Sequence, residues 1–270
     1  MARLISLAVS DRGSVYIVDG ANQRVICFNR DLTPLKDFTG RGDLAVAFSE
    51  PRSVTVDVDH NVWVSDFGHR RLVRANDRLD LTAEIDLRND TALGGLGRPG
   101  GAIVTSFGDI WVLDADNQRI AVLDPVGDMS LIVGDFGYPG GKLDHPSKMV
   151  VGPDDHVWVC DSGNRRVVVY DGEGGVVAEI NDPILEDPVS VVIDSQRRAW
   201  ILDSETGKIH CFDRDRRYLS TVGPMISGAD QPLLHPVDLA FMPDGRFVII
   251  DGLGRLLICR PISATPGTTP

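Results

Sequence analysis

One pattern of apolar and polar positions recurs along the whole chain. A short apolar segment of strand-like character ends in an aspartate, and the ending aspartates (the anchor aspartates) lie 47, 48, 47, 42 and 48 residues apart. β-rich repeats of roughly 40–50 residues are typical of propeller blades. The spacing therefore predicts six blades, whose segments are Val15–Asp19, Val62–Asp66, Ile110–Asp114, Val157–Asp161, Ala199–Asp203 and 247–251.

Each repeat predicts four strands. A first apolar strand is followed by a turn rich in Asp, His, Asn and Gly, then by the anchor strand, and then by a third and a weaker fourth strand. No segment shows the long period of an amphipathic helix. The prediction is an all-β chain, a six-bladed β-propeller with four-stranded antiparallel blades. In five repeats a proline fifteen residues before the anchor aspartate opens the first strand: Pro51, Pro99, Pro146, Pro188 and Pro236.

The last blade lacks an obvious fourth strand. Residues 4–9 align with the first strand of the later repeats, so the N-terminal segment is not a spare strand. We expect the propeller domain to span residues 1–260 and residues 261–270, with three prolines, to be a tail or linker. Either this tail pairs weakly as the missing strand, or the natural protein continues beyond it.

Two further repeated features are expected to be architectural. A cation follows the anchor aspartate in every repeat, and all four tryptophans share one repeat position, so we expect ion pairs within blades and packing between blades. Neither feature is then available to bind nucleic acid. The cations are Arg24, Arg71, Arg119, Arg166, Lys208 and Arg255.

The fourth repeat carries the combined pattern most completely and resembles the NHL repeat. The resemblance extends over residues 1 to about 260 and implies a six-bladed propeller. It says little about function, because one fold hosts many functions. The matching residues are Pro146, Trp158, Asp161, Asn164, Arg166, Tyr170 and Asp171.

Charge narrows the classes of partner. The chain has 27 Lys and Arg against 39 Asp and Glu, a formal net charge of −12. This acidity disfavours nucleic acid, including RNA, and anionic lipid. No apolar run is long enough to span a bilayer, and the start lacks the apolar core of a signal peptide, so we expect a cytoplasmic protein while an exported parent stays open. The four cysteines form no CxxC pair and are expected to be buried thiols.

Candidate chemistry lies at the residue before the repeat proline, where six equivalent positions gather near one end of the first strands. His145, Asp187 and His235 come from consecutive blades, and two imidazoles with a carboxylate predict a candidate divalent-metal site. In the amidating-lyase branch of NHL-like propellers, three histidines hold a catalytic metal in the channel. The resemblance to NHL propellers gives this chain two histidines at equivalent places and not the third, which counts against that activity. The other predicted binding residues are Glu50, Arg98, Lys148, Asp238 and Tyr138.

Two functions follow from these features. The regular blades and irregular inter-blade loops favour a non-enzymatic scaffold that presents its channel mouth and loops to a protein or peptide, with no secure cofactor. The alternative is a metal-dependent lyase or hydrolase with its site at the channel mouth. Metal content separates the two hypotheses.

Overall fold

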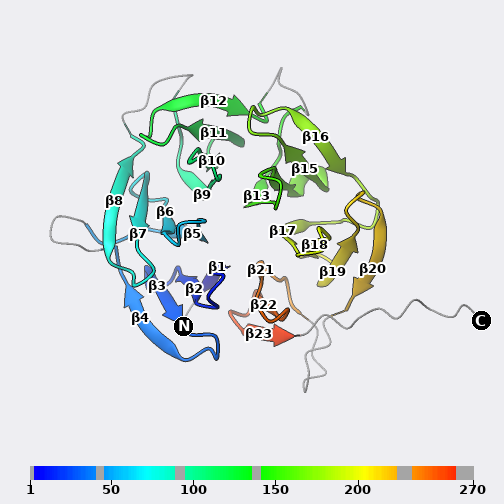
Figure 1. The fold of residues 1–270 in the computed structure, drawn as a ribbon, viewed down its shortest axis with the longest axis horizontal. Helices are drawn as coiled ribbons and strands as arrows, with labels where there is room; N and C mark the ends of the chain where they lie inside the picture. The colour runs from blue at the N-terminus through cyan, green and yellow to red at the C-terminus, as the bar shows by residue number, and fades with distance from the viewer. Residues whose placement is uncertain (1–2, 41–45, 89–94, 136–140, 224–232, 260–270) are drawn as a thin grey trace, which may run out of the picture.

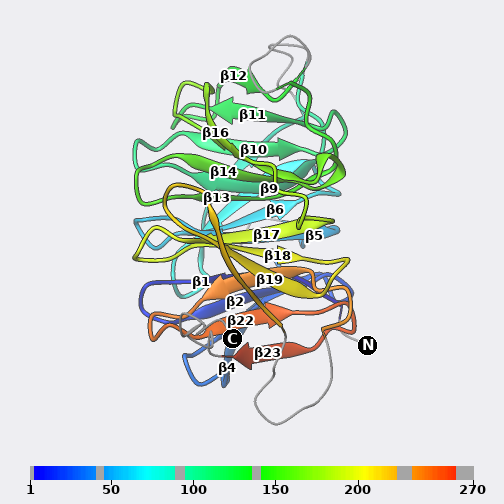
Figure 2. The same cartoon turned by 90° about the vertical axis from the view of Figure 1, so that its right-hand side faces the viewer.

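The computed structural model describes residues 3–40, 46–88, 95–135, 141–223 and 233–259. Six antiparallel sheets surround a central channel (Figure 1), and in side view the inner strands run along the channel direction (Figure 2). Five sheets have four strands in chain order, and the sixth has three among the described residues. The predicted all-β, six-bladed propeller is confirmed. The tail expected to pair or to continue, residues 261–270, lies outside the described residues.

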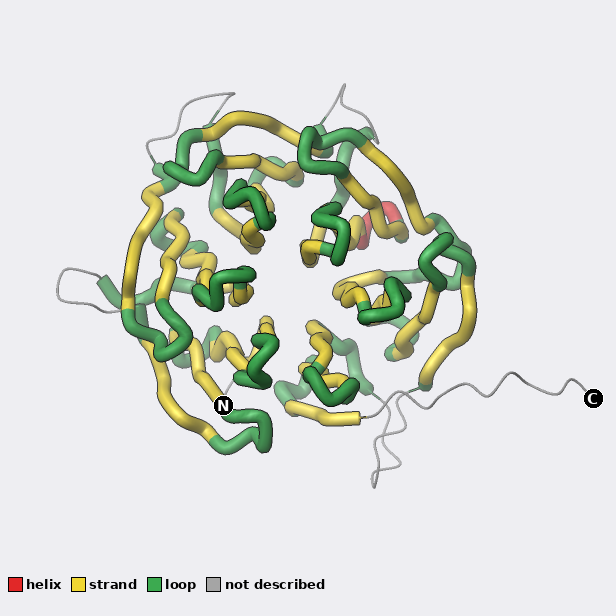
Figure 3. Tube along the Cα trace, viewed as in Figure 1, coloured by secondary structure: helices red, strands yellow, loops and turns green. Residues whose placement is uncertain are grey.

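The strands take the same place in every blade (Figure 3). The innermost strands are β1 (Leu4–Val9), β5 (Pro51–Val56), β9 (Pro99–Val104), β13 (Pro146–Val151), β17 (Pro188–Ile193) and β21 (Asp238–Phe241). The second strands are β2 (Val15–Asp19), β6 (Val62–Asp66), β10 (Ile110–Asp114), β14 (Val157–Asp161), β18 (Ala199–Asp203) and β22 (Phe247–Ile250). The third strands are β3 (Arg24–Phe28), β7 (Arg71–Ala75), β11 (Arg119–Leu123), β15 (Arg166–Tyr170), β19 (Lys208–Phe212) and β23 (Leu256–Cys259). The outer strands are β4 (Pro34–Phe38), β8 (Leu81–Asp86), β12 (Met129–Val133), β16 (Val176–Ile180) and β20 (Tyr218–Val222), and one short 3-10 helix, η2 (Ser162–Asn164), follows β14.

Burial explains the sequence pattern of each strand. The second strands are buried along their whole length, because both faces of each blade pack against neighbouring blades. Outer strands such as β8 alternate between half-buried and exposed residues. The tryptophans pack between blades as expected: the Trp200 ring lies 5.3 Å from that of Phe247 in the next blade, and the Trp111 ring lies 6.3 Å from that of Tyr170.

The ring closes where blade one meets blade six (Figure 1). Every sheet consists of consecutive strands, so within the described residues no strand is exchanged between the first and last blades. An apolar cluster that includes Leu7 and Ile17 of blade one with Val248 and Ile250 of blade six fills the seam. In the described part of the chain, side chains rather than shared strands hold the ring together.

The repeated cation binds its anchor aspartate in five blades. Arg71 makes three such contacts: Nε lies 2.7 Å from Asp66, Nη1 lies 2.9 Å from Glu84, and Nη2 donates to the Val46 carbonyl at 2.5 Å. The other arginines, Arg24, Arg119, Arg166 and Arg255, likewise contact the anchor aspartates of their own blades.

Blade five departs from this arrangement. The side chain of Lys208 is exposed, and among the contacts of the described residues it makes no ion pair with Asp203. The Thr206 hydroxyl donates to Asp203 at 3.0 Å instead, and two backbone N–H groups of the preceding loop donate to the other carboxylate oxygen. The expectation that all six cations are paired is wrong for Lys208, because Asp203 already has neutral donors.

The cysteines are free thiols. Cys27, Cys160 and Cys211 are buried as expected, and Cys259 is half-buried. Burial raises the pKa of Cys211 and of Cys259 to about 11. These two groups are therefore protonated and weakly nucleophilic at neutral pH.

The two kinds of repeat cation predict different mutant stabilities. Arg71→Leu is expected to lower the free energy of unfolding by about 3–5 kcal/mol, because it leaves a buried carboxylate without its cation. Lys208→Leu, at the same repeat position but exposed, is expected to change it by less than about 0.5 kcal/mol. Urea denaturation of both variants measures the difference. Equal losses would show that the position acts through packing alone.

Candidate functional site

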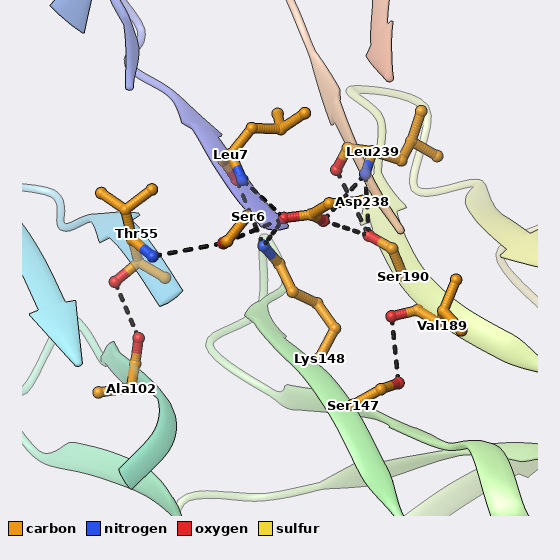
Figure 4. Close-up of polar contacts among 11 residues, drawn as sticks. Ser6, Leu7, Thr55, Ala102, Ser147, Lys148, Val189, Ser190, Asp238 and Leu239 are labelled. Atoms are coloured by element: carbon orange, nitrogen blue, oxygen red, sulfur yellow. Dashed lines mark hydrogen bonds and ion pairs between the residues drawn. The ribbon is translucent and has the colours of Figure 1, made fainter. Parts of the chain in front are cut away.

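Polar side chains meet inside the channel at the residue two places after the repeat proline. At this position the blades carry Lys148 in blade four and Asp238 in blade six, with small residues elsewhere. Lys148 Nζ lies 2.8 Å from Asp238 Oδ2, so an ion pair joins two blades that are not neighbours (Figure 4). The remaining members of this ring are Ser6, Ser53, Gly101 and Ser190.

The Asp238 carboxylate receives five donors. Oδ2 accepts from Lys148 Nζ and the Leu7 N–H, both at 2.8 Å, and from Ser6 Oγ at 3.2 Å. Oδ1 accepts from Ser190 Oγ and from the N–H of the following residue, both at 2.9 Å. A buried charge is tolerated only when it is paired and hydrogen-bonded, and this one is both. The carboxylate thus connects blades one, four, five and six.

Some of these contacts follow a repeated geometry. Each innermost strand is a sheet edge, so one row of its backbone groups has no strand partner. At several seams the ring side chain of one blade accepts an N–H from the innermost strand of the next blade. The pairs are Asp238 with Leu7 at 2.8 Å, Ser6 with Val54 at 3.3 Å, and Ser190 with Leu239 at 3.3 Å.

The structure places Lys148 and Asp238 inside the channel. Their side chains are 12% and 3% exposed, respectively. Lys148 Nζ also donates to a second acceptor, the Leu7 carbonyl, at 3.3 Å. Both residues therefore serve first to hold the ring, and Lys148 alone of the two borders the cavity described next.

A cavity of about 640 Å³ occupies the channel on one side of this ion pair. It begins at Lys148 and opens among the turns that join the first and second strands, at the end of the channel remote from the repeat prolines. Its walls are mainly apolar side chains at the ends of the innermost strands, including Val56, Val104, Val150, Val192 and Phe241. The sequence did not lead us to predict this cavity. Apolar residues at the end of most first strands were the one feature that could have indicated it.

The predicted metal residues lie at the opposite end, before the prolines. His145 is exposed, with Nδ1 2.6 Å from Asp144 Oδ1, and His235 is also exposed. Burial raises the pKa of the half-buried Asp187, the carboxylates of Asp203 and Glu205 raise it further, and His235 opposes them. Across the described ranges, no three His, Cys, Asp or Glu side chains form a group fit to hold a metal ion. The metal site stays a prediction.

The remaining predicted residues also flank the prolines. The guanidinium groups of Arg52 and Arg98 lie 4.2 and 4.3 Å from the ring centre of Phe67. Arg98 Nη2 lies 2.7 Å from Asp116, whose pKa this hydrogen bond lowers, and Glu50 Oε2 lies 3.8 Å from Arg52. Tyr138 lies outside the described residues.

Part of the chain is similar to a known family of repeats. Residues 143–170, which span β13 to β15, match the family model described as the NHL repeat. The NHL repeat-containing protein 3 of Homo sapiens is 39% identical over 69 residues, and that of Mus musculus is equally similar. This chain is a six-bladed propeller that carries a match to the NHL repeat in its fourth blade. The match takes in 24% of the chain and only 20% of each relative's length.

Solved structures resemble this propeller along nearly its whole length. A virginiamycin B lyase from Staphylococcus aureus has a TM-score of 0.64 at 17% identity, covering 98% of this chain and 86% of that one. A gluconolactonase from Xanthomonas campestris has 0.71 at 18%, covering 96% and 86%. The WD40 propeller domain of Doa1 has 0.68 at 12%, covering 97% and 80%. At these identities the likeness shows the fold alone.

Among the described residues, no helical segment is long and apolar enough to cross a bilayer.

The ion pair in the channel predicts a large stability effect. Asp238→Asn is expected to lower the free energy of unfolding of the propeller by about 3–5 kcal/mol, because Lys148 is left as a buried, uncompensated cation. Guanidinium denaturation measures the loss. Asp215→Asn, at an exposed carboxylate, is the control and should be neutral. A neutral Asp238→Asn would mean that the seam does not depend on the charge.

Asp187 predicts a pH-dependent stability. Its raised pKa means that the folded state holds this proton more tightly than the unfolded state, so ionisation costs stability as the pH rises through the folded pKa. Asp187→Asn is therefore expected to raise the melting temperature at pH 7, and the gain should vanish below about pH 4, where both states bind the proton. Calorimetry across this range tests it, with exposed Glu186→Gln as control. A lower melting temperature at pH 7 would contradict the assignment.

Proposed function

We propose that this NHL propeller is a non-enzymatic binding scaffold that takes a protein or peptide partner at the mouth of its channel cavity. The observation that carries the proposal is the cavity itself, about 640 Å³ with mainly apolar walls. Ligand sites typically measure about 300–1,000 Å³ and combine apolar walls with few polar groups. The mouth used is the one formed by the turns after the innermost strands.

The polar groups that border the cavity support binding more than catalysis. Lys148 is held by Asp238 and the Leu7 carbonyl. The carboxylate of Asp57 accepts from Asn61 and from the indole N–H of Trp63. These groups already serve the architecture, whereas a general base or nucleophile needs a partner arrangement aimed at a substrate.

The rim adds exposed apolar surface. Val58 is 68% exposed and lines the cavity, and Phe107, next to the lining residue Ser106, is 80% exposed. Exposed apolar side chains gathered at one place mark interaction sites more than singly scattered ones do. The cavity and its rim together offer a pocket with an apolar approach.

Selection from a random peptide library displayed on phage tests the proposal. Val192→Trp is expected to fill the cavity and abolish the enrichment of peptides seen with the unchanged protein. Leu35→Trp, on the exposed face of outer strand β4, is the matched control and should retain them. Thermal melting checks that each variant is folded.

A second variant covers the case in which Val192→Trp does not fold. Val58→Asp/Phe107→Ser changes only exposed rim residues and should also reduce the enrichment. Peptides that bind all variants equally, or no enriched peptide at all, would overturn the scaffold proposal.

The alternative function, a metal-dependent lyase or hydrolase using His145, Asp187 and His235, is favoured by one observation. Asp187 and His235, on adjacent blades, are close enough to influence each other electrostatically. Elemental analysis of the purified protein decides between the two. A stoichiometric metal that disappears in His145→Ala/His235→Ala would overturn the pure scaffold, and a metal-free protein with both histidines intact would overturn the enzyme.

A further inference from the structure

Charge is unevenly distributed around the mouth of the cavity, with carboxylates on one half and arginines on the other. Its rim consists of the six turns between first and second strands. In blades two to four, the turns 57–61, 105–109 and 152–156 carry five carboxylates and no Lys or Arg. In blades five, six and one the turns carry three carboxylates and four arginines. The first group is Asp57, Asp59, Asp109, Asp154 and Asp155; the second is Asp194, Asp244 and Asp11 with Arg197, Arg198, Arg246 and Arg12.

Few basic side chains contact the carboxylates of the rim. Arg197 Nη1 lies 4.0 Å from Asp154 Oδ2, at the edge of ion-pair distance. His156 Nδ1 lies 3.5 Å from the same carboxylate, and His60 Nδ1 lies 3.3 Å from Asp11 in blade one. Asp155 is held in place by its hydrogen bond from the Ser106 N–H at 2.9 Å. The half formed by blades two to four therefore keeps a negative field.

The same half carries the apolar part of the rim. Val58 belongs to blade two and Phe107 to blade three. Val126, which is 82% exposed, lies in the turn between the third and fourth strands of blade three. This turn packs against the turn of Phe107, since a Cβ built on Gly108 would stand 3.2 Å from Pro125 Cγ. Apolar and acidic surface thus meet beside one opening.

The interior determines which group enters. The walls are mainly apolar, and the charge at the inner end is the Lys148 ammonium. Asp238, its partner, already accepts five donors and offers little to an incoming cation. Because Lys148 and Asp238 neutralise each other, a cationic group in the depth of the cavity would lose its hydration without a free carboxylate to pair with, whereas the exposed carboxylates of the rim attract it. An apolar group is favoured inside.

We propose that the occupant is a peptide segment in which a large apolar side chain stands next to Lys or Arg. The apolar side chain enters the cavity and covers Val58 and Phe107, while the cation lies over Asp59, Asp154 and Asp155. This inference rests on the proposed scaffold function and names the chemistry of its partner. Rim charges of this kind act mainly on association rate and partner choice.

Short synthetic peptides with a central Phe or Leu, flanked by Lys, Ser or Glu, are the probes. Fluorescence anisotropy is expected to show the Lys-flanked peptides binding at least about ten-fold more tightly than the Glu-flanked ones at low ionic strength, with the preference shrinking as salt is added. Asp59→Lys/Asp154→Lys should remove or reverse the preference. Asp31→Lys/Asp215→Lys makes the same change of net charge at exposed outer turns and should leave it intact.

The outcomes separate this inference from the function on which it rests. If peptides bind, and Val192→Trp abolishes binding, but Lys, Ser and Glu flanks are equivalent, the partner chemistry is refuted while the scaffold stands. If both charge-reversed variants lose the preference equally, the net charge and not the rim is responsible, and the inference is again refuted. If no peptide depends on the cavity, the scaffold function itself fails.

Discussion

The buried carboxylate of Asp238 is the interaction on which the ring depends most. Six sheets arranged in a circle leave one seam where the first and last blades meet, and within the described residues no exchanged strand fastens it. The Asp238 carboxylate joins the blades at this seam by accepting hydrogen bonds from blades one, four and five, and from the N–H of Leu239 in its own blade. These donors neutralise the charge and replace its hydration. The seam is therefore held by a buried hydrogen-bond network as well as by the apolar cluster around Leu7 and Val248.

The architecture was predictable because six copies of one pattern reinforce each other. The anchor aspartates, the tryptophans and the repeat prolines each keep one phase, so the blades, and the packing of the tryptophans between them, follow from spacing alone. Lys208 shows where a repeat misleads: its position predicts an ion pair, but Thr206 and two loop amides satisfy Asp203 first. Pattern gives the average blade, and individual contacts decide the exceptions.

The candidate site was less predictable. The sequence predicted a site among the polar residues before the prolines. The cavity lies at the other end of the channel and is lined by residues such as Val104 and Val192. An apolar side chain at a channel wall and one in a core have the same sequence signal, so only the arrangement of blades separates them. The positions of Lys148 and Asp238 were identified from the repeat, but their contact across the channel depends on the geometry of the ring.

The seam also has a kinetic consequence. Each sheet is built from consecutive strands, so its contacts are local in sequence and can form early. The contacts of Asp238 with Leu7 and Ser6 join residues 231 and 232 positions apart, and closing so long a loop is entropically costly. Ring closure at Asp238 therefore costs more chain entropy than the formation of a single blade, whose strands follow one another directly in the sequence.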